Sequence, residues 1–168
     1  NKAMKKVKFI FVLSIIFLMF LNLSAKERIV VLPFQNMDGN MKFNVYCYKL
    51  QDSVYKAFLA KDPESKYFTL VPADSVEDIL ADMNLEPTNP QYPTDLWKAV
   101  EMLNVEKVIM GNFNYQAERF LINAYIYDVQ TKLAYPEHQA RDIFKAEENI
   151  LESVKTIVKR LSPLLISE

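Results

Sequence analysis

The sequence is poor in glycine, cysteine and histidine. Its 168 residues include 2 glycines, 1 cysteine and 1 histidine, at Gly39, Gly111, Cys47 and His138. Phosphate-binding loops and dinucleotide-binding fingerprints need several glycines within a few residues, so both are excluded. One cysteine cannot form an intrachain disulfide, and with a single histidine it excludes the common zinc sites. A hydrolytic triad would have to use His138 as its base, so the composition argues against most enzyme classes.

The first 25 residues have the three parts of a secretory signal peptide. Met4–Lys8 is basic, Phe9–Leu23 is an apolar run, and Ala25 ends the segment with a small side chain. We therefore predict a signal peptide over residues 1–25, with Asn1–Ala3 upstream of the true start at Met4. The alternative is an uncleaved membrane anchor, although the apolar run is short for a bilayer span. Export of this kind predicts a periplasmic protein.

Residues 26–168 are predicted to form a single domain. The whole chain has a net charge of −1, and cleavage after Ala25 removes several lysines and no acidic residue. An acidic mature chain lacks the basic footprint that binding to phosphate backbones requires, so we expect no nucleic-acid partner.

The pattern of apolar residues predicts an α/β (α+β) fold, with a mixed β-sheet of about five strands and helices packed on it. Spacings of two indicate strands, and spacings of three and four indicate helices. The expected order is β-α-β-α-α-β-β-β-α. The strands are expected at 29–32, 67–71, 107–115, 119–129 and 133–144, and the helices at 43–58, 75–83, from 94, and 145–161.

The expected strand directions follow from the connections. The first two strands are joined by a helix and should be parallel, whereas the last three are joined by hairpins and should be antiparallel. The last strand contains Pro136 and should lie at an edge of the sheet. Asp74 with Glu77 has the spacing of a capping box, and Thr94 is expected to cap the next helix.

Three stretches carry a resemblance to a known family. They are IVVLPFQN at 29–36, LNVEKVIMGNF at 103–113, and the segment 121–133, which ends in INAYIYDVQTKL. These stretches resemble the periplasmic amino-terminal domain of TolB and the wider group of CsgG, LpoB and FlgT. The resemblance implies a non-enzymatic domain that binds other envelope proteins or assembles into rings. The chain departs from the pattern at Lys132, where a glycine is expected, and it has no cysteine after the apolar run to accept a lipid.

The strand at 119–129 alternates strongly, which divides its side chains between two faces. One face carries Phe120, Ile122, Ala124 and Ile126 and should belong to the core. The other face is rich in tyrosine and asparagine, and tyrosine is common in protein interfaces because its ring is apolar and its hydroxyl finds partners. This face is therefore a candidate binding surface; the alternative is a face packed under a helix. The candidate residues on these strands are Tyr115, Asn123, Tyr125 and Tyr127.

The loop LEPTNPQYP, at 85–93, is a second candidate surface, with Tyr92 as an anchor, or else a plain connector. Cys47 lies on the apolar stripe of a helix and should be buried, and His138 should be exposed at a strand edge. The acidic cluster Asp74–Asp82 could hold a cation, but acidic residues near a helix start are also favoured by the helix dipole. We therefore assign no catalytic residue, metal or cofactor.

The sequence predicts a non-enzymatic protein–protein interaction or assembly module of a bacterial envelope machine. The machine could serve cell-wall synthase activation, outer-membrane secretion, the flagellum or the Tol-Pal system. The expected partner is an envelope protein or a second copy of the chain. Association with the outer membrane or another membrane would run through a partner or through an uncleaved Phe9–Leu23 segment. The alternative is a small-ligand or lipid-binding protein with an apolar cleft under the terminal helix.

Overall fold

The fold is a mixed β-sheet with helices on both faces, as predicted. A computed structural model describes residues 26–166, so the predicted signal peptide lies outside the described residues. The strands follow the order β3-β1-β4-β5-β6, and β2 pairs with β4 beside β1. They are β1 (Glu27–Val31), β2 (Gln35–Asn36), β3 (Phe68–Leu70), β4 (Lys107–Gln116), β5 (Arg119–Asp128) and β6 (Leu133–Lys145). The helices are η2 (Met41–Phe43), α2 (Val45–Lys61), α3 (Ala73–Asp82), α4 (Tyr92–Leu103), η3 (Glu147–Glu152) and α5 (Ser153–Leu165).

The strand directions confirm the expected connections. β1 pairs parallel with both β3 and β4, whereas β4, β5 and β6 pair antiparallel. β6 lies at an edge, where Pro136 removes no hydrogen bond needed by a further strand. The short β2 was not expected. It forms because the chain after Pro33 continues alongside β4, where the Met37 N–H donates to the Phe113 carbonyl at 2.8 Å.

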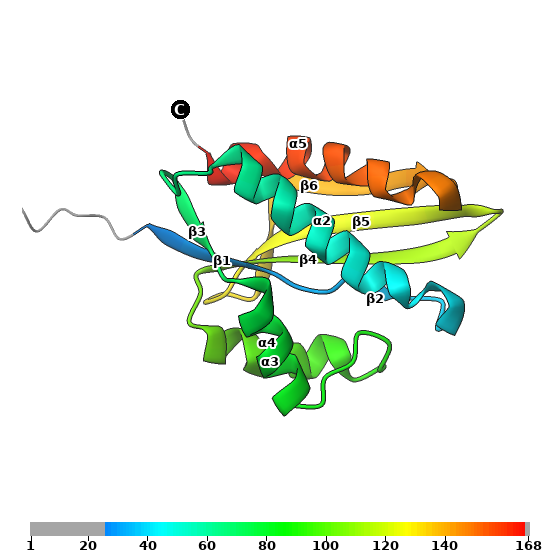
Figure 1. Cartoon of the computed structure of the whole chain (residues 1–168), viewed down its shortest axis with the longest axis horizontal. Coiled ribbons are helices and arrows are strands. Elements are labelled where there is room, and N and C mark those ends of the chain that lie inside the picture. The colour runs from blue at the N-terminus through cyan, green and yellow to red at the C-terminus, as the bar shows by residue number, and fades with distance from the viewer. Residues whose placement is uncertain (1–25, 167–168) are drawn as a thin grey trace, which may run out of the picture.

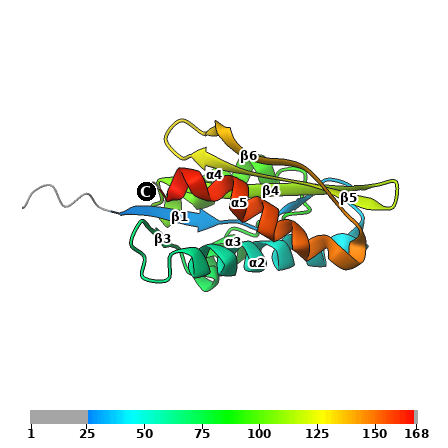
Figure 2. The ribbon, with the colours of Figure 1, turned by 90° about the horizontal axis from the view of Figure 1, so that it is seen from above.

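Two layers of helices cover the sheet, one on each face (Figure 1). α2 and α5 run side by side over the first face, as the view from above also shows (Figure 2), and α3 and α4 lie against the second. β1 supplies both cores: Ile29 and Val31 face α2, and Val30 and Leu32 face α3 and α4. This is why its sequence is continuously apolar instead of alternating.

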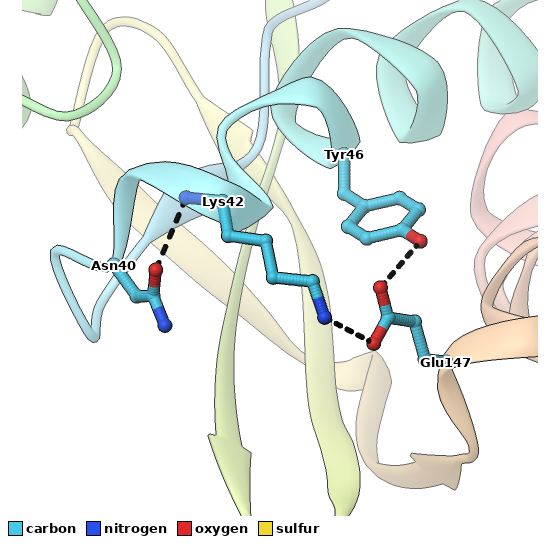
Figure 3. Close-up of polar contacts among 4 residues, drawn as sticks. All are labelled: Asn40, Lys42, Tyr46 and Glu147. Atoms are coloured by element: carbon cyan, nitrogen blue, oxygen red, sulfur yellow. Dashed lines mark hydrogen bonds and ion pairs between the residues drawn. The ribbon is translucent and has the colours of Figure 1, made fainter.

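The start of α2 is tied to the segment that precedes α5. The Asn40 side chain accepts a hydrogen bond from the Lys42 N–H at 3.0 Å, which caps η2 (Figure 3). The Lys42 ammonium lies 3.1 Å from a Glu147 carboxylate oxygen, and the Tyr46 hydroxyl donates to the other oxygen at 3.3 Å. Burial, with the nearby Glu147 charge, raises the pKa of Tyr46.

All four predicted helix starts differ from the structure. α2 begins at Val45 and not at residue 43. α3 begins at Ala73, so its N-cap is Pro72, and Asp74 lies inside the first turn. Pro72 fits the N-cap position because its backbone is extended and its carbonyl accepts a hydrogen bond from the Val76 N–H. α4 begins at Tyr92 rather than Thr94 because proline fits the first turn of a helix, where no N–H is needed.

The terminal helix starts later than the predicted residue 145. Lys145 is still paired with Phe120 in the β5–β6 ladder, so the chain cannot be helical there. The segment η3 then turns the chain, and α5 begins at Ser153.

The shortage of glycine leaves other residues in the left-handed region of the backbone. Lys132 has a φ of 58°, which explains why a glycine is the expected residue in this turn. Ala117 and Glu118, with φ of 47° and 61°, form the two-residue turn between β4 and β5. Asp142, with a φ of 57°, lies at an irregularity where β6 has extra residues opposite β5.

Candidate functional site

The helices cover the second face of the sheet unevenly. The core under α3 and α4 takes its strand residues from β1 and from Val108 of β4, with Met110, Tyr127 and Val129 packed at its margin. The side chains of Asn112 and Asn114 on β4 and of Leu121, Asn123 and Tyr125 on β5 belong to neither core and are half-buried, and Tyr127 marks the boundary with the core under α4. We call this surface, with the Phe144 side chain of β6, the open face. Its residues are Asn112, Asn114, Leu121, Asn123, Tyr125, Tyr127 and Phe144.

A short chain of amide hydrogen bonds crosses the open face. Asn123 and Asn112 are directly opposite each other on β5 and β4, and the Asn123 side-chain NH₂ donates to the Asn112 oxygen at 3.1 Å. The Asn123 oxygen accepts from the Asp142 N–H at 2.9 Å. The NH₂ group and the oxygen of the Asn123 side chain are therefore both hydrogen-bonded within the protein. The bond to Asp142 holds the irregular part of β6 in place. The Asn114 side-chain oxygen is buried and has no partner among the described residues.

Three aromatic rings follow one another from α4 onto the open face. Trp97 and Tyr127 meet edge to face with centroids 5.9 Å apart, and Tyr127 meets Tyr125 at 6.1 Å. Burial, followed by the neighbouring Tyr125, raises the pKa of Tyr127, so this hydroxyl stays protonated near neutral pH. Within residues 26–166, neither hydroxyl donates to a protein acceptor. These two hydroxyls are thus available to a partner.

A pocket of about 220 Å³ lies at the inner end of the open face, between α4 and the sheet. Its walls include Trp97, Tyr127 and Asn112, and Lys132 stands at its margin. The Lys132 ammonium lies 5.7 Å from the centre of the Trp97 ring and 3.1 Å from a Glu101 oxygen. The pocket therefore combines apolar rings with a few polar groups, which suits insertion of a side chain.

The structure brings three of the five predicted binding residues together. Asn123, Tyr125 and Tyr127 share the open face, as the alternation predicts. Tyr115 lies on the opposite face, where its ring packs 4.8 Å from Phe43 and 4.9 Å from Phe120.

Tyr92 is not an exposed loop anchor, and this part of the prediction is wrong. It is the first residue of α4 and is only 2% exposed, with its hydroxyl 3.4 Å from the Pro33 carbonyl oxygen. Burial raises the pKa of Tyr92. The ring packs into the core under α4, which ties the proline-rich loop to the sheet.

Sequence reasoning missed two aromatic residues of the site. Phe144 on β6 lies opposite Leu121, and its side chain is 56% exposed. Trp97, on α4, lines the pocket. The alternation along β6 could have placed Phe144 on this face, but the irregular pairing near Asp142 breaks the period.

The remaining candidates lie elsewhere. Cys47 lies on the buried side of α2 and is fully buried, as predicted, and burial raises the pKa of its thiol to about 11. His138 is half-buried on the edge strand β6. The described residues contain no group of three or more histidine, cysteine, aspartate or glutamate side chains placed to hold a metal ion. Between residues 26 and 166, no helix has the length and apolar character needed to cross a membrane.

No family model matches the chain, and no curated protein matches it. Several solved structures are similar in fold. The LpoB C-terminal domain from Salmonella enterica is 13% identical with a TM-score of 0.45, and the match covers 75% of this chain and 87% of that chain. Lipoprotein GNA1162 from Neisseria meningitidis is 14% identical with a TM-score of 0.47, covering 83% and 99%. TolB from Acinetobacter baumannii is 17% identical with a TM-score of 0.46, covering 84% of this chain but 29% of that one. LpoB and TolB are among the proteins that the sequence resembles.

Proposed function

We propose that this protein is a non-enzymatic interaction module of the bacterial cell envelope, which binds another envelope protein through the open face. The observation that carries the proposal is a sheet face left uncovered by helices, where Phe144 is more than half exposed and two tyrosine hydroxyls donate to no acceptor among residues 26–166. Tyrosine and phenylalanine supply much of the energy of protein interfaces because large rings lose little entropy on binding.

The size of the pocket favours a protein partner over a small molecule. Its volume of about 220 Å³ is below the roughly 300–1,000 Å³ of most ligand sites. A single aromatic or branched side chain from a partner would fill it, against a wall that includes Trp97 and Tyr127. At this pocket, a small-ligand or lipid-binding role is therefore the weaker alternative.

The cellular setting is supported by the sequence. The basic, apolar and small segments of residues 1–25 favour export, and the resemblance to TolB, CsgG, LpoB and FlgT favours a periplasmic partner. The partner would belong to cell-wall synthesis, outer-membrane secretion, the flagellum or the Tol-Pal system, or would be a second copy of this chain.

The test is photo-crosslinking in the cell from the open face. A benzophenone amino acid replaces Tyr125 in the full chain, and a matched chain carries it at Lys56, which is exposed on α2 on the other side of the sheet. We expect a defined envelope protein to be captured from position 125 and not from position 56. Capture of the same proteins from both positions, or of none from 125, would refute the proposal.

A binding measurement with the captured protein then tests the tyrosine itself. Tyr125→Ala should weaken binding by roughly 30-fold, which corresponds to about 2 kcal/mol for an interface hot spot. Tyr125 is preferable to Tyr127 because Tyr127 also packs against Trp97, and its loss would disturb the fold. The control is Lys56→Ala, which should leave the affinity unchanged.

A further inference from the structure

A second groove lies on the opposite side of the sheet, between α2 and α5. Its floor is formed by small apolar side chains, Ala57 and Ala60 from α2 and Val154 and Val158 from α5. Its volume is about 980 Å³, and it opens to solvent along the helices. At the start of α2, by contrast, Tyr46 with Lys42 reaches across to Glu147 and bridges the two segments (Figure 3).

Among the residues that the structure describes, three lysines line this groove and no carboxylate does. Lys61 is the last residue of α2, and Lys155 and Lys159 are one turn apart on α5. All three are exposed, and no ion pair found within residues 26–166 involves any of them. Like charges at i and i+4 destabilise a helix by a few tenths of a kcal/mol, so Lys155 and Lys159 oppose folding slightly. An anionic partner would relieve this repulsion.

The shape of the groove decides which anionic partner fits. A small ligand would leave much of its surface in water, because the groove is open along its length. A helix fits better, since small residues on the floor allow helix axes to approach to about 8–10 Å. The chain's own apolar segment Phe9–Leu23 is a poor occupant because it follows the basic stretch Met4–Lys8, which the lysines would repel.

We propose that the α2–α5 groove binds an acidic amphipathic helix of a protein partner. The apolar stripe of that helix would lie on Ala57, Ala60 and the two valines, and flanking glutamates or aspartates would pair with the three lysines. Helix-in-groove recognition of this kind needs no movement of the sheet. The site is separate from the open face, which lies on the other side of the sheet.

The test uses a fluorescent synthetic peptide of about 18 residues, five helical turns, with a leucine–alanine stripe flanked by glutamates. A second peptide has lysine in place of every glutamate. By fluorescence anisotropy, we expect the protein to bind the acidic peptide at least 10-fold more tightly than the basic one. Binding of the acidic peptide should weaken as sodium chloride is raised, because salt screens exposed charges. Equal binding of the two peptides, or no binding of the acidic one, would overturn the proposal.

Variants then locate the peptide. Lys155→Glu with Lys159→Glu should weaken binding at least 10-fold, and Lys49→Glu with Lys56→Glu, which changes the net charge equally on exposed positions outside the groove, should not. Ala60→Trp fills the groove without changing charge and should also block the peptide. If both charge-reversal pairs weaken binding equally, the attraction is nonspecific and the groove is not the site.

Crosslinking in the cell identifies the natural occupant. A benzophenone at Ala60 of the full chain should capture a protein segment whose sequence is acidic and amphipathic. Capture of a phospholipid, of a second copy of this chain, or of a basic segment would overturn the proposal. Because position 60 is on the opposite side of the sheet from position 125, failure here leaves the open-face proposal standing.

Discussion

The ring of Phe34 lies directly over Gly111. Phe34 follows Pro33 at the end of β1 and is fully buried, and a Cβ placed on Gly111 would overlap three atoms of its ring. Gly111 has an ordinary strand backbone, so it is required by this close approach and not by a left-handed conformation. These two residues come from separate stretches of the resemblance, and the fold places them in contact. The close packing of these two residues therefore explains both the Leu32-Pro33-Phe34 sequence that follows β1 and the glycine within β4.

Replacing Gly111 with alanine should destabilise the protein by about 2 kcal/mol or more, because a buried aromatic ring must move. Urea unfolding followed by circular dichroism measures the loss. Combining Gly111→Ala with Phe34→Leu should cost less than the sum of the single changes, since the smaller side chain frees the space. Strictly additive effects would show that the two residues do not interact.

Replacing Ala117-Glu118 by Asn-Gly should stabilise the protein. Both residues have positive φ in a two-residue hairpin turn, a conformation that costs ordinary residues roughly 1–2 kcal/mol each and that Asn-Gly adopts readily. We expect a gain of about 1–2 kcal/mol and a Tm several degrees higher by calorimetry. Arg119→Gly, in the strand beside the turn, is the control and should lower the Tm. An unchanged or lower Tm for the Asn-Gly variant would contradict the turn geometry.

The Asp62 carboxylate should make stability depend on pH in the acid range. Burial raises its pKa, but the N–H groups of Tyr67, Lys66 and Phe68 donate to it and outweigh burial, so the pKa is lowered overall. A lowered folded-state pKa contributes stability that is present above the unfolded value, about 3.9, and is lost as pH falls through the folded value.

Asp62→Ala should therefore cost about 2 kcal/mol or more at neutral pH, and the difference from wild type should shrink below about pH 4. Chemical unfolding at a series of pH values measures this. Asp52→Ala is the control, because Asp52 forms only an exposed pair with Lys56 and should change stability by less than about 1 kcal/mol. Parallel pH profiles for wild type and Asp62→Ala would rule out the role assigned to Asp62.

The Cys47 thiol should be unreactive in the native protein. It is fully buried, and burial raises its pKa to about 11, so little thiolate exists at pH 8. Labelling with 5,5′-dithiobis(2-nitrobenzoic acid) should be slow without denaturant and complete in urea. Rapid labelling of the folded protein would mean that α2 opens locally far more often than its packing implies.

Much of the fold could be predicted because the spacing of apolar residues is regular along most of its strands and helices. The apolar run at 29–32 predicts a strand covered on both faces, and the alternation at 119–129 predicts a strand with one core face. Helix starts were less predictable. A capping pattern such as Asp74 with Glu77 competes with Pro72, two residues before Asp74, and only the backbone before α3 decides which residue begins the helix.

The candidate site was predictable only in part. Asn123, Tyr125 and Tyr127 share a face because side chains on a strand alternate. Tyr92 was misplaced because proline-rich segments usually form loops, whereas here the proline fits the first turn of α4 and the ring enters the core. Phe144 was missed because the irregular pairing of β6 shifts its period.

The sequence by itself determined the elements and their faces, because periodicity, proline and the shortage of glycine act locally along the chain. The tertiary structure alone decided which faces are covered. α3 and α4 are too short to reach the ends of β4 and β5, so the face with Tyr125 stays open on one side of the sheet. On the other side, small residues of α2 leave a groove beside α5. Lys61 lines this groove together with Lys155 and Lys159, although more than 90 residues separate Lys61 from them in sequence. The exposure of neither surface is encoded in a local pattern, because it depends on how far one element extends over another.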